Sequence, residues 1–427
     1  MHKKNIVLTI REVEPGLVRA VKKLSDEIGY ELHGITLIGK EFINKKNRKK
    51  DVTGFFKEVV CDFDNPTSIQ KALRPYIDNI LLVTCRFETA IQQLRKTIPF
   101  LPYVNTSSDT ALLWATEKLL MRDRLRDHDE NLVPKYKNLT SAELSYVHKM
   151  INGMSFPIII KPNGLNSSLL VKICSNESEL QENLVKTFEV IHEVYKRERG
   201  AGVPSVLVEE VIHGDMYSVD GYVNSKGDIY CLPIVRVITA NSVGKEGFYT
   251  YRTILPVDEL PDEYQKSCFV ATKSAVKALH LNSTTVHVEL FHTGNGVWKI
   301  IELGPRIGGH REDIYREVYG TDHYYNDLLV RIDRDPVINH KHIRYASGFN
   351  VYADSEGIIR SIEGIDEIKK MTCVVWFKVH LKPGDSAVFA GNGGEVVAEG
   401  IISSPDKKTL EVDMQKIRKI LQIHVSN

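Results

Sequence analysis

The stretch that decides the fold runs from Thr285 to Arg311 and reads TVHVELFHTGNGVWKIIELGPRIGGHR. Its two apolar segments flank Asn295-Gly296, the dipeptide most typical of a β-hairpin closed by a two-residue type I′ turn. Such a turn places Glu289 directly opposite Glu302 on one face of the hairpin. Because like charges in that relation destabilise a sheet, the pattern predicts a compensating cation between the two carboxylates. A hard divalent ion such as Mg²⁺, with water or phosphate oxygens as its other ligands, meets that need.

The opposite face of the predicted hairpin is apolar, since Val288, Leu290, Ile301 and Leu303 alternate with the glutamates and can pack on a core. The glutamates also have an alternative interpretation, in which they lie on a solvent face and repel each other weakly through water. The hairpin alone does not separate the two interpretations.

A tight loop follows the second glutamate and contains Pro305, Arg306, Gly308 and Gly309. Glycine lets backbone N–H groups approach an anion closely, and arginine offers paired donors to a phosphate or a carboxylate. Two acids followed by an arginine and a glycine pair therefore predict a metal–phosphate site, which favours the first interpretation.

The composition of the 427 residues is that of a globular protein, with 42% hydrophobic and 26% charged residues. A formal net charge of +1 creates no global field toward nucleic acid or a membrane surface, so neither is expected as a partner. No apolar run approaches the ~18 residues of a membrane-spanning helix, and the start MHKKNIVLTIREVEPG predicts a strand rather than a signal peptide. The 6 cysteines are spread singly among apolar neighbours, which predicts reduced thiols in a cytoplasmic protein.

The beginning of the chain alternates between strand and helix patterns. The predicted strands are Ile6–Ile10, Glu31–Ile38 and Ile80–Thr84, and the predicted helices are Leu17–Ile28, Pro66–Tyr76 and Glu88–Lys96. This alternation indicates a Rossmann-like parallel sheet with helical crossovers. No GxGxxG sequence follows the first strand, so we do not interpret this region as a dinucleotide site.

Three domains are predicted from the changes in pattern along the chain. We expect an N-terminal Rossmann-like domain over residues 1–108, a central domain over 109–340 and a C-terminal α+β domain over 341–427. The central domain is expected to have a small lobe at about 140–212 and a large lobe at about 213–340. The basic run from Lys45 to Lys50 is interpreted as a solvated loop, with a nucleic-acid or localisation patch as the less favoured alternative.

With these residues in this order, the chain resembles the ATP-grasp superfamily of carboxylate–amine ligases, and within it the group that contains bacterial L-amino-acid ligases. The resemblance covers a strand–helix domain, two grasping lobes and an α+β tail with a region like GIIRSIEGIDEIKKM (357–371). It implies an ATP-grasp fold assembled from α/β and α+β domains. It also implies a site for ATP and Mg²⁺, with Mn²⁺ as a substitute metal.

The resemblance further implies a set of residues that hold ATP. Lysines in TEKLLMRDRL and FPIIIKP match phosphate-binding lysines, two serines belong to a flap, and a hinge with paired acids reads the adenine edge. An acid, an arginine and a phenylalanine then serve the ribose, the triphosphate and the adenine ring. The lysines are Lys118 and Lys161, the flap serines are Ser167 and Ser168, and the hinge residues are Glu209, Glu210 and Ile212. Asp215 is the acid for the ribose, Arg236 is the arginine for the triphosphate, and Phe291 is the phenylalanine for the adenine ring. Ordinary surface lysines, strand-edge charges and a core phenylalanine are the alternatives.

The same resemblance assigns the metal and the substrates. Glu289 and Glu302 match paired magnesium ligands, and the position of a third ligand, commonly asparagine, falls at Gly304, which has no side chain. Arg306 and Lys161 are the expected catalytic residues, because the matching arginine stabilises an acyl phosphate and the matching lysine binds phosphate. The expected substrate contacts are Arg252, Arg306, Gly308, Gly309, His310 and Arg311.

The implied activity is ATP-dependent ligation of a carboxylate, expected to be an amino acid, to an amine through an acyl phosphate, with release of ADP and phosphate. A carboxylase or purine-pathway type of ATP-grasp enzyme is the alternative, and an ATP-binding regulatory module without ligation is a third. The expected partners are small-molecule carboxylate and amine substrates, and a homodimer is compatible with the sequence.

Overall fold

The structure is a computed structural model that describes residues 4–43, 54–165, 169–198, 202–240, 242, 250–294, 296–388 and 396–426. Four features of the sequence prediction lie outside these residues. They are the basic run Lys45–Lys50, the flap residues Ser167 and Ser168, and Asn295 of the predicted turn.

The N-terminal part is built on a four-stranded parallel sheet in the order β3-β2-β1-β4. Its strands are β1 (Ile6–Ile10), β2 (His33–Gly39), β3 (Phe56–Cys61) and β4 (Ile80–Thr84), and its helices are α1 (Pro15–Ile28), α2 (Pro66–Leu73) and α3 (Ile91–Thr97). Every residue of β1 is buried, as expected for a central parallel strand with helices on both faces. The predicted parallel sheet is confirmed, and β3 is a strand that the prediction omitted, since most of its residues are exposed or half-buried.

The small lobe contains a four-stranded antiparallel sheet in the order β5-β8-β6-β7. Its strands are β5 (Tyr136–Leu139), β6 (Ile158–Pro162), β7 (Lys172–Cys174) and β8 (Val206–Glu210), and α6 (Leu144–Ile151) and α7 (Glu177–Glu198) pack against them. Two helices, α4 (Asp109–Thr116) and α5 (Lys118–His128), connect the N-terminal part to this lobe. They are separated at Glu117, whose backbone is extended (φ −105°, ψ 115°).

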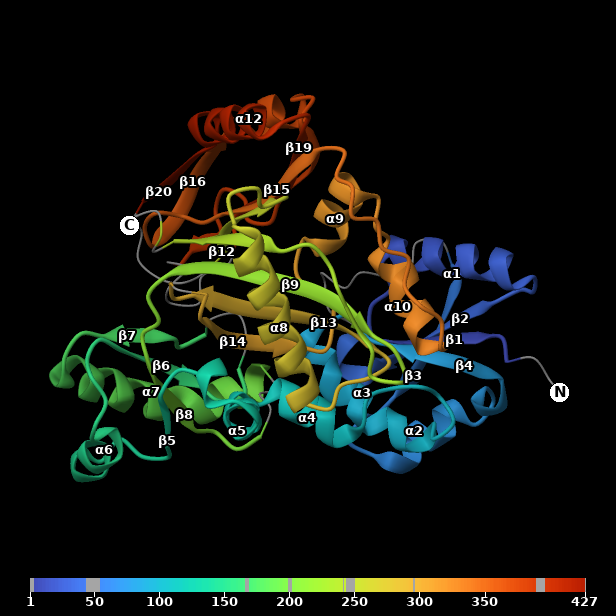
Figure 1. Ribbon diagram of the computed structural model, residues 1–427, viewed down its shortest axis with the longest axis horizontal. Coiled ribbons are helices and arrows are strands. Elements are labelled where there is room, and N and C mark those ends of the chain that lie inside the picture. Colours follow the sequence, from blue (N-terminus) through green and yellow to red (C-terminus); the bar gives the residue numbers. More distant parts are fainter. Residues whose placement is uncertain are drawn as a thin grey trace.

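The largest sheet has nine strands and joins the large lobe to the C-terminal part, in the order β14-β13-β9-β11-β12-β15-β19-β17 with β10 beside β9. The strands are β9 (Asp215–Val223), β10 (Ile229–Cys231), β11 (Val235–Thr239), β12 (Thr250–Leu255), β13 (Thr284–His292), β14 (Trp298–Gly304), β15 (Tyr345–Val351), β17 (Val374–Val379) and β19 (Ala398–Ser404). The long helix α8 (Asp262–Ala278) covers one face of this sheet over β14 and β10. Figure 1 shows this sheet in the middle of the molecule, between the small lobe and the N-terminal part.

The remaining elements complete the large lobe and the C-terminal part. Helices α9 (Arg311–Tyr319) and α10 (His323–Arg331) follow the hairpin, and α10 packs on α1 of the N-terminal part. The chain ends in a three-stranded sheet, β18-β16-β20, with β16 (Gly357–Glu363), β18 (Ser386–Ala387) and β20 (Gln422–Ser426). Helices α11 (Ile365–Lys369) and α12 (Lys407–Ile420) share a core with β15 and β19.

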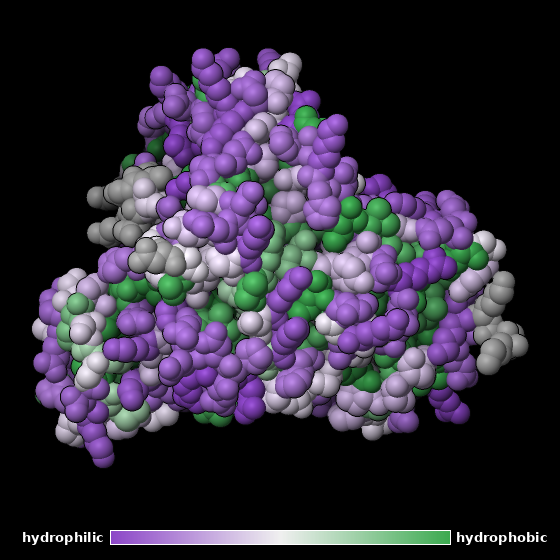
Figure 2. Space-filling model, viewed as in Figure 1, coloured by the Kyte–Doolittle hydropathy of each residue, from purple (hydrophilic) through white to green (hydrophobic). Residues whose placement is uncertain are grey.

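Hydrophilic residues cover most of the molecular face shown in Figure 2, and hydrophobic residues show as smaller patches among them. None of the helices within the described residues combines the length and the apolar character needed to cross a membrane.

The hairpin of β13 and β14 keeps the predicted pairing of Glu289 with Glu302, but its ladder is irregular. Toward the turn, Leu290 pairs with Ile300, so Ile301 is an extra residue that forms a β-bulge in β14. Ile300 is fully buried in the core, whereas Ile301 lines the neighbouring cleft. The expectation that Ile301 packs on the core face is therefore corrected, because the bulge changes the side-chain alternation at this position.

Candidate active site

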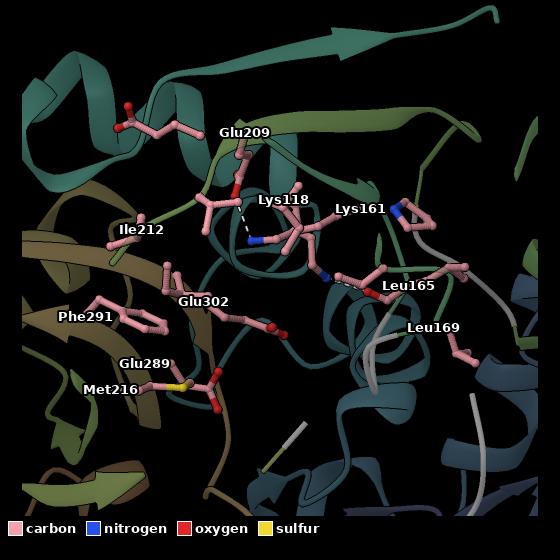
Figure 3. A pocket seen from close by; sticks show the side chains of 16 residues that line it. Lys118, Lys161, Leu165, Leu169, Glu209, Ile212, Met216, Glu289, Phe291 and Glu302 are labelled. Atoms are coloured by element: carbon pink, nitrogen blue, oxygen red, sulfur yellow. Dashed lines mark hydrogen bonds and ion pairs between the residues drawn. The ribbon is translucent and has the colours of Figure 1, made fainter. Parts of the chain in front are cut away.

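A cleft between the small lobe and the nine-stranded sheet brings together many of the expected site residues. It encloses about 850 Å³, part of which is open to solvent. The expected residues that line it are Lys118, Lys161, Glu209, Glu210, Ile212, Glu289, Phe291 and Glu302. In Figure 3 the two glutamates of the hairpin and Phe291 approach from one side, and the two lysines and Glu209 approach from the other.

The paired glutamates have different surroundings. Glu289 Oε1 lies 3.3 Å from His287 Nε2, and His287 Nδ1 lies 3.1 Å from Asp220 Oδ2 on the adjacent strand β9. Burial alone would raise the pKa of Glu289, but the hydrogen bond and charge of His287 lower it, so this carboxylate stays ionised. Within the described residues, Glu302 has no hydrogen bond or ion pair, and its carboxylate lines the cleft.

This donor set fits a magnesium ion that is shared with phosphate. No group of three or more His, Cys, Asp or Glu side chains that could hold a metal ion occurs among the described residues. Mg²⁺ is commonly bound by one or two carboxylates, with waters and substrate phosphates as its other ligands, so Glu289 and Glu302 suffice as protein ligands. Gly304 follows on the same face, where a Cβ atom would lie only 2.9 Å from Glu88 Oε2. A side chain at Gly304, where the resemblance implies a third ligand, would therefore have to displace the carboxylate of Glu88.

Two lysines extend toward the cleft from the side opposite the glutamates. Lys161 is the penultimate residue of β6 and is 9% exposed, and its Nζ lies 2.7 Å from Glu209 Oε2. Burial and the positive charges of Arg122 and Lys118 lower the pKa of Lys161, and the charge of Glu209 opposes that shift. Lys118 is the first residue of α5, and its Nζ donates to the carbonyl oxygen of Leu165.

The acids of the hinge after β8 contact other groups of the protein. Glu209 is fully buried, and its carboxylate accepts from Arg122 Nε at 2.7 Å and from Lys161 Nζ at 2.7 Å. Glu210 Oε1 accepts from the backbone N–H of Lys135 at 3.0 Å. The hinge is predicted to read an adenine edge through an acid and adjacent backbone groups. Two buried cations occupy the Glu209 carboxylate, while Glu209 and Glu210 both line the cleft, so the role of the hinge stays a prediction. Ile212 and Phe291 remain as apolar walls of the cleft.

Arg236 and Asp215 lie on the face of the sheet opposite the cleft. Arg236 pairs with Tyr217 across β11 and β9, whereas Met216, the next residue in β9, lines the cleft. Because successive side chains of a strand point to opposite faces, Arg236 is directed away from the cleft. Its guanidinium instead lies 3.0 Å from Asp215 and 3.0 Å from Glu259. The predictions that Asp215 contacts the ribose and Arg236 the triphosphate are corrected accordingly.

Arg252 is also part of the scaffold. Its side chain is 4% exposed, and its two terminal nitrogens donate to the carboxylate of Glu411 on α12 at 2.7 and 3.0 Å. Its Nε donates to Ser347 Oγ at 2.8 Å. The prediction that Arg252 meets a substrate is corrected, because its terminal nitrogens fasten α12 to the sheet and its Nε bonds to Ser347 of β15.

The loop after β14 is held by the end of the N-terminal sheet. Arg306 Nε donates to Glu88 Oε2 at 2.8 Å, and Arg86 Nη1 donates to the carbonyl oxygen of Ile307 at 2.6 Å. Arg86 and Glu88 follow β4 directly, at the carboxyl edge of the parallel sheet. The N-terminal part, which has no glycine fingerprint of its own, thus positions Arg306 and the backbone at Gly308.

The residues after the glycine pair are engaged by the protein. His310 has a left-handed backbone (φ 59°), and its Nε2 lies 2.9 Å from Glu399 Oε2 of β19. Arg311 is 4% exposed, and its Nη2 donates to Ser218 Oγ at 2.8 Å, beneath Glu289. The expectation that Arg311 contacts a substrate is therefore corrected to a supporting role in the sheet. Gly309 borders open space, since a Cβ there would meet nothing within 4 Å.

Several supporting residues were absent from the sequence prediction: Arg122, Asp220, His287, Glu88 and Glu399. A signal existed for His287, which lies two residues before Glu289 on the same face of a predicted strand. A signal also existed for Arg122, which lies one helical turn after Lys118. The others come from distant segments of the chain, so no local pattern indicates them.

Comparison with known proteins identifies the kind of domain that holds this cleft. Residues 154–313 match the family model described as an ATP-grasp domain. An L-arginine-specific L-amino acid ligase of Bacillus subtilis is 21% identical over 278 residues, which cover 64% of this chain and 63% of that protein. An uncharacterized protein, y4rH, of Sinorhizobium fredii is 22% identical over 285 residues, which cover 66% of this chain and 56% of that protein. The matched region thus spans less than two thirds of either relative.

Solved structures resemble the whole chain more completely. An L-amino acid ligase from Bacillus licheniformis superposes with a TM-score of 0.81 at 17% identity, covering 100% of both chains. A carboxyaminoimidazole ribonucleotide synthase from Aspergillus clavatus, complexed with ATP, superposes with a TM-score of 0.71 at 12% identity, covering 98% of both chains. The resemblance to the ATP-grasp superfamily and the predicted ATP-grasp fold are confirmed.

Proposed function

We propose that this chain, which contains an ATP-grasp domain, is an ATP-dependent ligase that joins a carboxylate, in the first place an amino acid, to an amine. The observation that carries the proposal is the cleft itself, where Glu289 and Glu302 face Lys118 and Lys161. Paired carboxylates and paired ammonium groups on opposite walls suit a magnesium nucleotide, whose metal and phosphates need ligands of both signs.

The proposed reaction has two steps. A carboxylate oxygen attacks the γ-phosphorus of ATP, which forms an acyl phosphate and releases ADP. The nitrogen of an uncharged amine then attacks the acyl carbon, the bond from that carbon to the phosphate oxygen breaks, and phosphate leaves. The nitrogen loses one proton to phosphate or water. No strong base is needed, so catalysis consists of positioning and charge neutralisation.

The site residues contribute to these steps from different sides of the cleft. Lys118 and Lys161 offset phosphate charge from the small-lobe side, and Glu289 and Glu302 hold the metal from the sheet. Bound Mg²⁺ would neutralise and orient the phosphate oxygens. Arg306 is fixed by its ion pair with Glu88 and lies in the short loop that follows Glu302. Its positive charge suits it to stabilise the negative charge of the acyl phosphate.

The test is a screen of amino-acid pairs with ATP and Mg²⁺, in which mass spectrometry detects condensed products and a coupled assay measures ADP release. L-arginine belongs in the first panel, since a relative is named for that substrate. We expect ADP release that requires both a carboxylate and an amine, with one dipeptide or amide formed per ADP. Nucleotide turnover that is indifferent to every carboxylate would contradict the proposal.

A carboxylating ligase is the second candidate, favoured by the fold shared with the carboxyaminoimidazole ribonucleotide synthase. The same assay separates the two functions, because a carboxylating enzyme requires bicarbonate. ADP release that depends on bicarbonate and not on an amino acid would select this candidate.

A further inference from the structure

Arg122 is a fully buried arginine that contacts both walls of the cleft. It lies on α5 and is 0% exposed. One set of its donors reaches β8 of the small lobe, and another reaches β14 of the nine-stranded sheet. A single guanidinium therefore bridges the two structures that enclose the cleft.

Toward the small lobe, Arg122 shares one carboxylate with Lys161. Arg122 Nε lies 2.7 Å from Glu209 Oε1, and Lys161 Nζ lies 2.7 Å from Glu209 Oε2. Glu209 and Arg122 are fully buried and Lys161 is 9% exposed, so these three groups form a largely buried cluster with two positive charges and one negative charge. The excess positive charge faces the cleft through Lys161, where an anionic phosphate would balance it.

Toward the sheet, Arg122 fixes the bulge that directs Glu302. Arg122 Nη2 donates to the carbonyl oxygen of Ile301 at 2.8 Å. Ile301 is the extra residue of the bulge, and Glu302 is the next residue in β14. A bulge leaves its backbone groups without regular ladder partners, so a donor from outside the strand stabilises its shape.

We propose that Arg122 is a positioning residue that sets Lys161 and Glu302 relative to each other across the cleft. The inference rests on the proposed magnesium–nucleotide site. Its physical basis is the planar fork of arginine, whose five donors can engage a carboxylate and a carbonyl at the same time. Because Arg122 binds part of the Glu209 carboxylate, Glu209 does not pair with the Lys161 ammonium alone. Arg122 also holds the backbone beside Glu302.

The test measures binding of Mg–ADP to the purified full-length protein by isothermal titration calorimetry, which requires no ligation substrate. Arg122→Gln leaves Lys161 and Glu209 as a balanced pair, so no buried charge loses its only partner. Because Glu209 then holds Lys161 alone, we expect Mg–ADP affinity to fall about tenfold, the equivalent of losing one charge-assisted interaction. The Mg²⁺ concentration for half-maximal nucleotide binding should also rise, since the Ile301 contact is lost.

Arg126→Gln is the matched control, because Arg126 lies one turn later on the same helix with a side chain that is 49% exposed. This variant should bind Mg–ADP like the wild type. Thermal unfolding checks that each variant is folded. Should Arg122→Gln not fold, Arg122→Lys replaces it, and there we expect Mg–ADP affinity near the wild type with a raised Mg²⁺ requirement, because lysine keeps the charge without the fork.

A second variant distinguishes positioning from a packing defect. Arg122→Gln combined with Glu209→Gln removes the acid that would hold Lys161, so Mg–ADP affinity should recover relative to Arg122→Gln alone. A double variant that binds no more tightly than the single one would overturn the inference, as would Arg122→Gln with wild-type affinity and wild-type Mg²⁺ requirement. Wild-type protein that binds no Mg–ADP would instead overturn the proposed function as well.

Discussion

Replacing Glu302 with glutamine should stabilise the free protein while it removes the metal site. Glu302 lies opposite Glu289 in the hairpin, a relation in which Cβ atoms are ~4.5–5.5 Å apart. Within the described part of the chain, Glu302 has no ion pair or hydrogen bond that compensates this repulsion. A glutamine keeps the size of the side chain and removes one of the two facing charges.

The expected gain follows from the geometry. Two full charges ~5 Å apart at an effective dielectric constant of about 20 repel by about 3 kcal/mol, which is an upper bound. His287 compensates Glu289 in part, and cross-strand pairs of like charge usually cost less than about 1 kcal/mol. We therefore expect Glu302→Gln to raise the free energy of unfolding of the free protein by at most about 1 kcal/mol. For a chain of 427 residues this corresponds to a rise in Tm of at most about 1–2 °C.

The assay is thermal unfolding with and without Mg–ADP, together with ligase turnover. Saturating Mg–ADP at about 100 times its Kd should stabilise the wild type by about 2.7 kcal/mol, and the variant by much less. Turnover should fall at least about a hundredfold, since replacing a residue that only supports a metal ligand already lowers metal affinity or activity by about 10–100-fold. Glu193→Gln, an exposed change on α7, controls for lost charge. A variant that is less stable without ligand and turns over normally would refute the reasoning.

Three further outcomes follow from the corrected positions of individual residues. Arg252→Gln should lower the free energy of unfolding by about 1–2 kcal/mol in urea titrations, because Glu411 is left without its partner, while the KM values of the substrates stay unchanged. Burial alone would raise the pKa of Glu399, but its two histidine partners lower it to about 2, below the ~4.3 of an unfolded chain. The ionised group therefore stabilises the fold above pH ~4.3 and loses this effect as the pH falls toward 2, so the Tm deficit of Glu399→Gln should shrink over that range. Gly304→Asn should displace Glu88 rather than add a metal ligand. A Mg²⁺ titration should therefore show that Mg²⁺ binds no more tightly than to the wild type, and ligase turnover should be lower.

The sequence by itself determined the features that depend on short-range periodicity. Strand–helix alternation predicted the parallel N-terminal sheet, and the hairpin signal predicted that Glu289 pairs with Glu302. Both inferences concern residues that are close in the chain, so the pattern of side chains carries enough information. Beside the turn, however, His292 pairs with Trp298, one residue out of the predicted register, and the bulge at Ile301 restores the pairing of Glu289 with Glu302. The bulge also changed which apolar residue faces the cleft.

Only the tertiary structure decided which charged residues face the cleft and which hold the scaffold together. The pairing register with neighbouring strands sets the face of the sheet to which each side chain of a strand points. A shift of one residue in that register moves a side chain to the other face. Arg236 and Arg252 were assigned to the site through the resemblance to ATP-grasp ligases, yet the pairing of their strands directs both away from it. The partner of Arg252 is Glu411, 159 residues further along the chain, and the cluster around Arg122 unites three elements in the same way. Such contacts depend on long-range packing, which no local sequence pattern encodes.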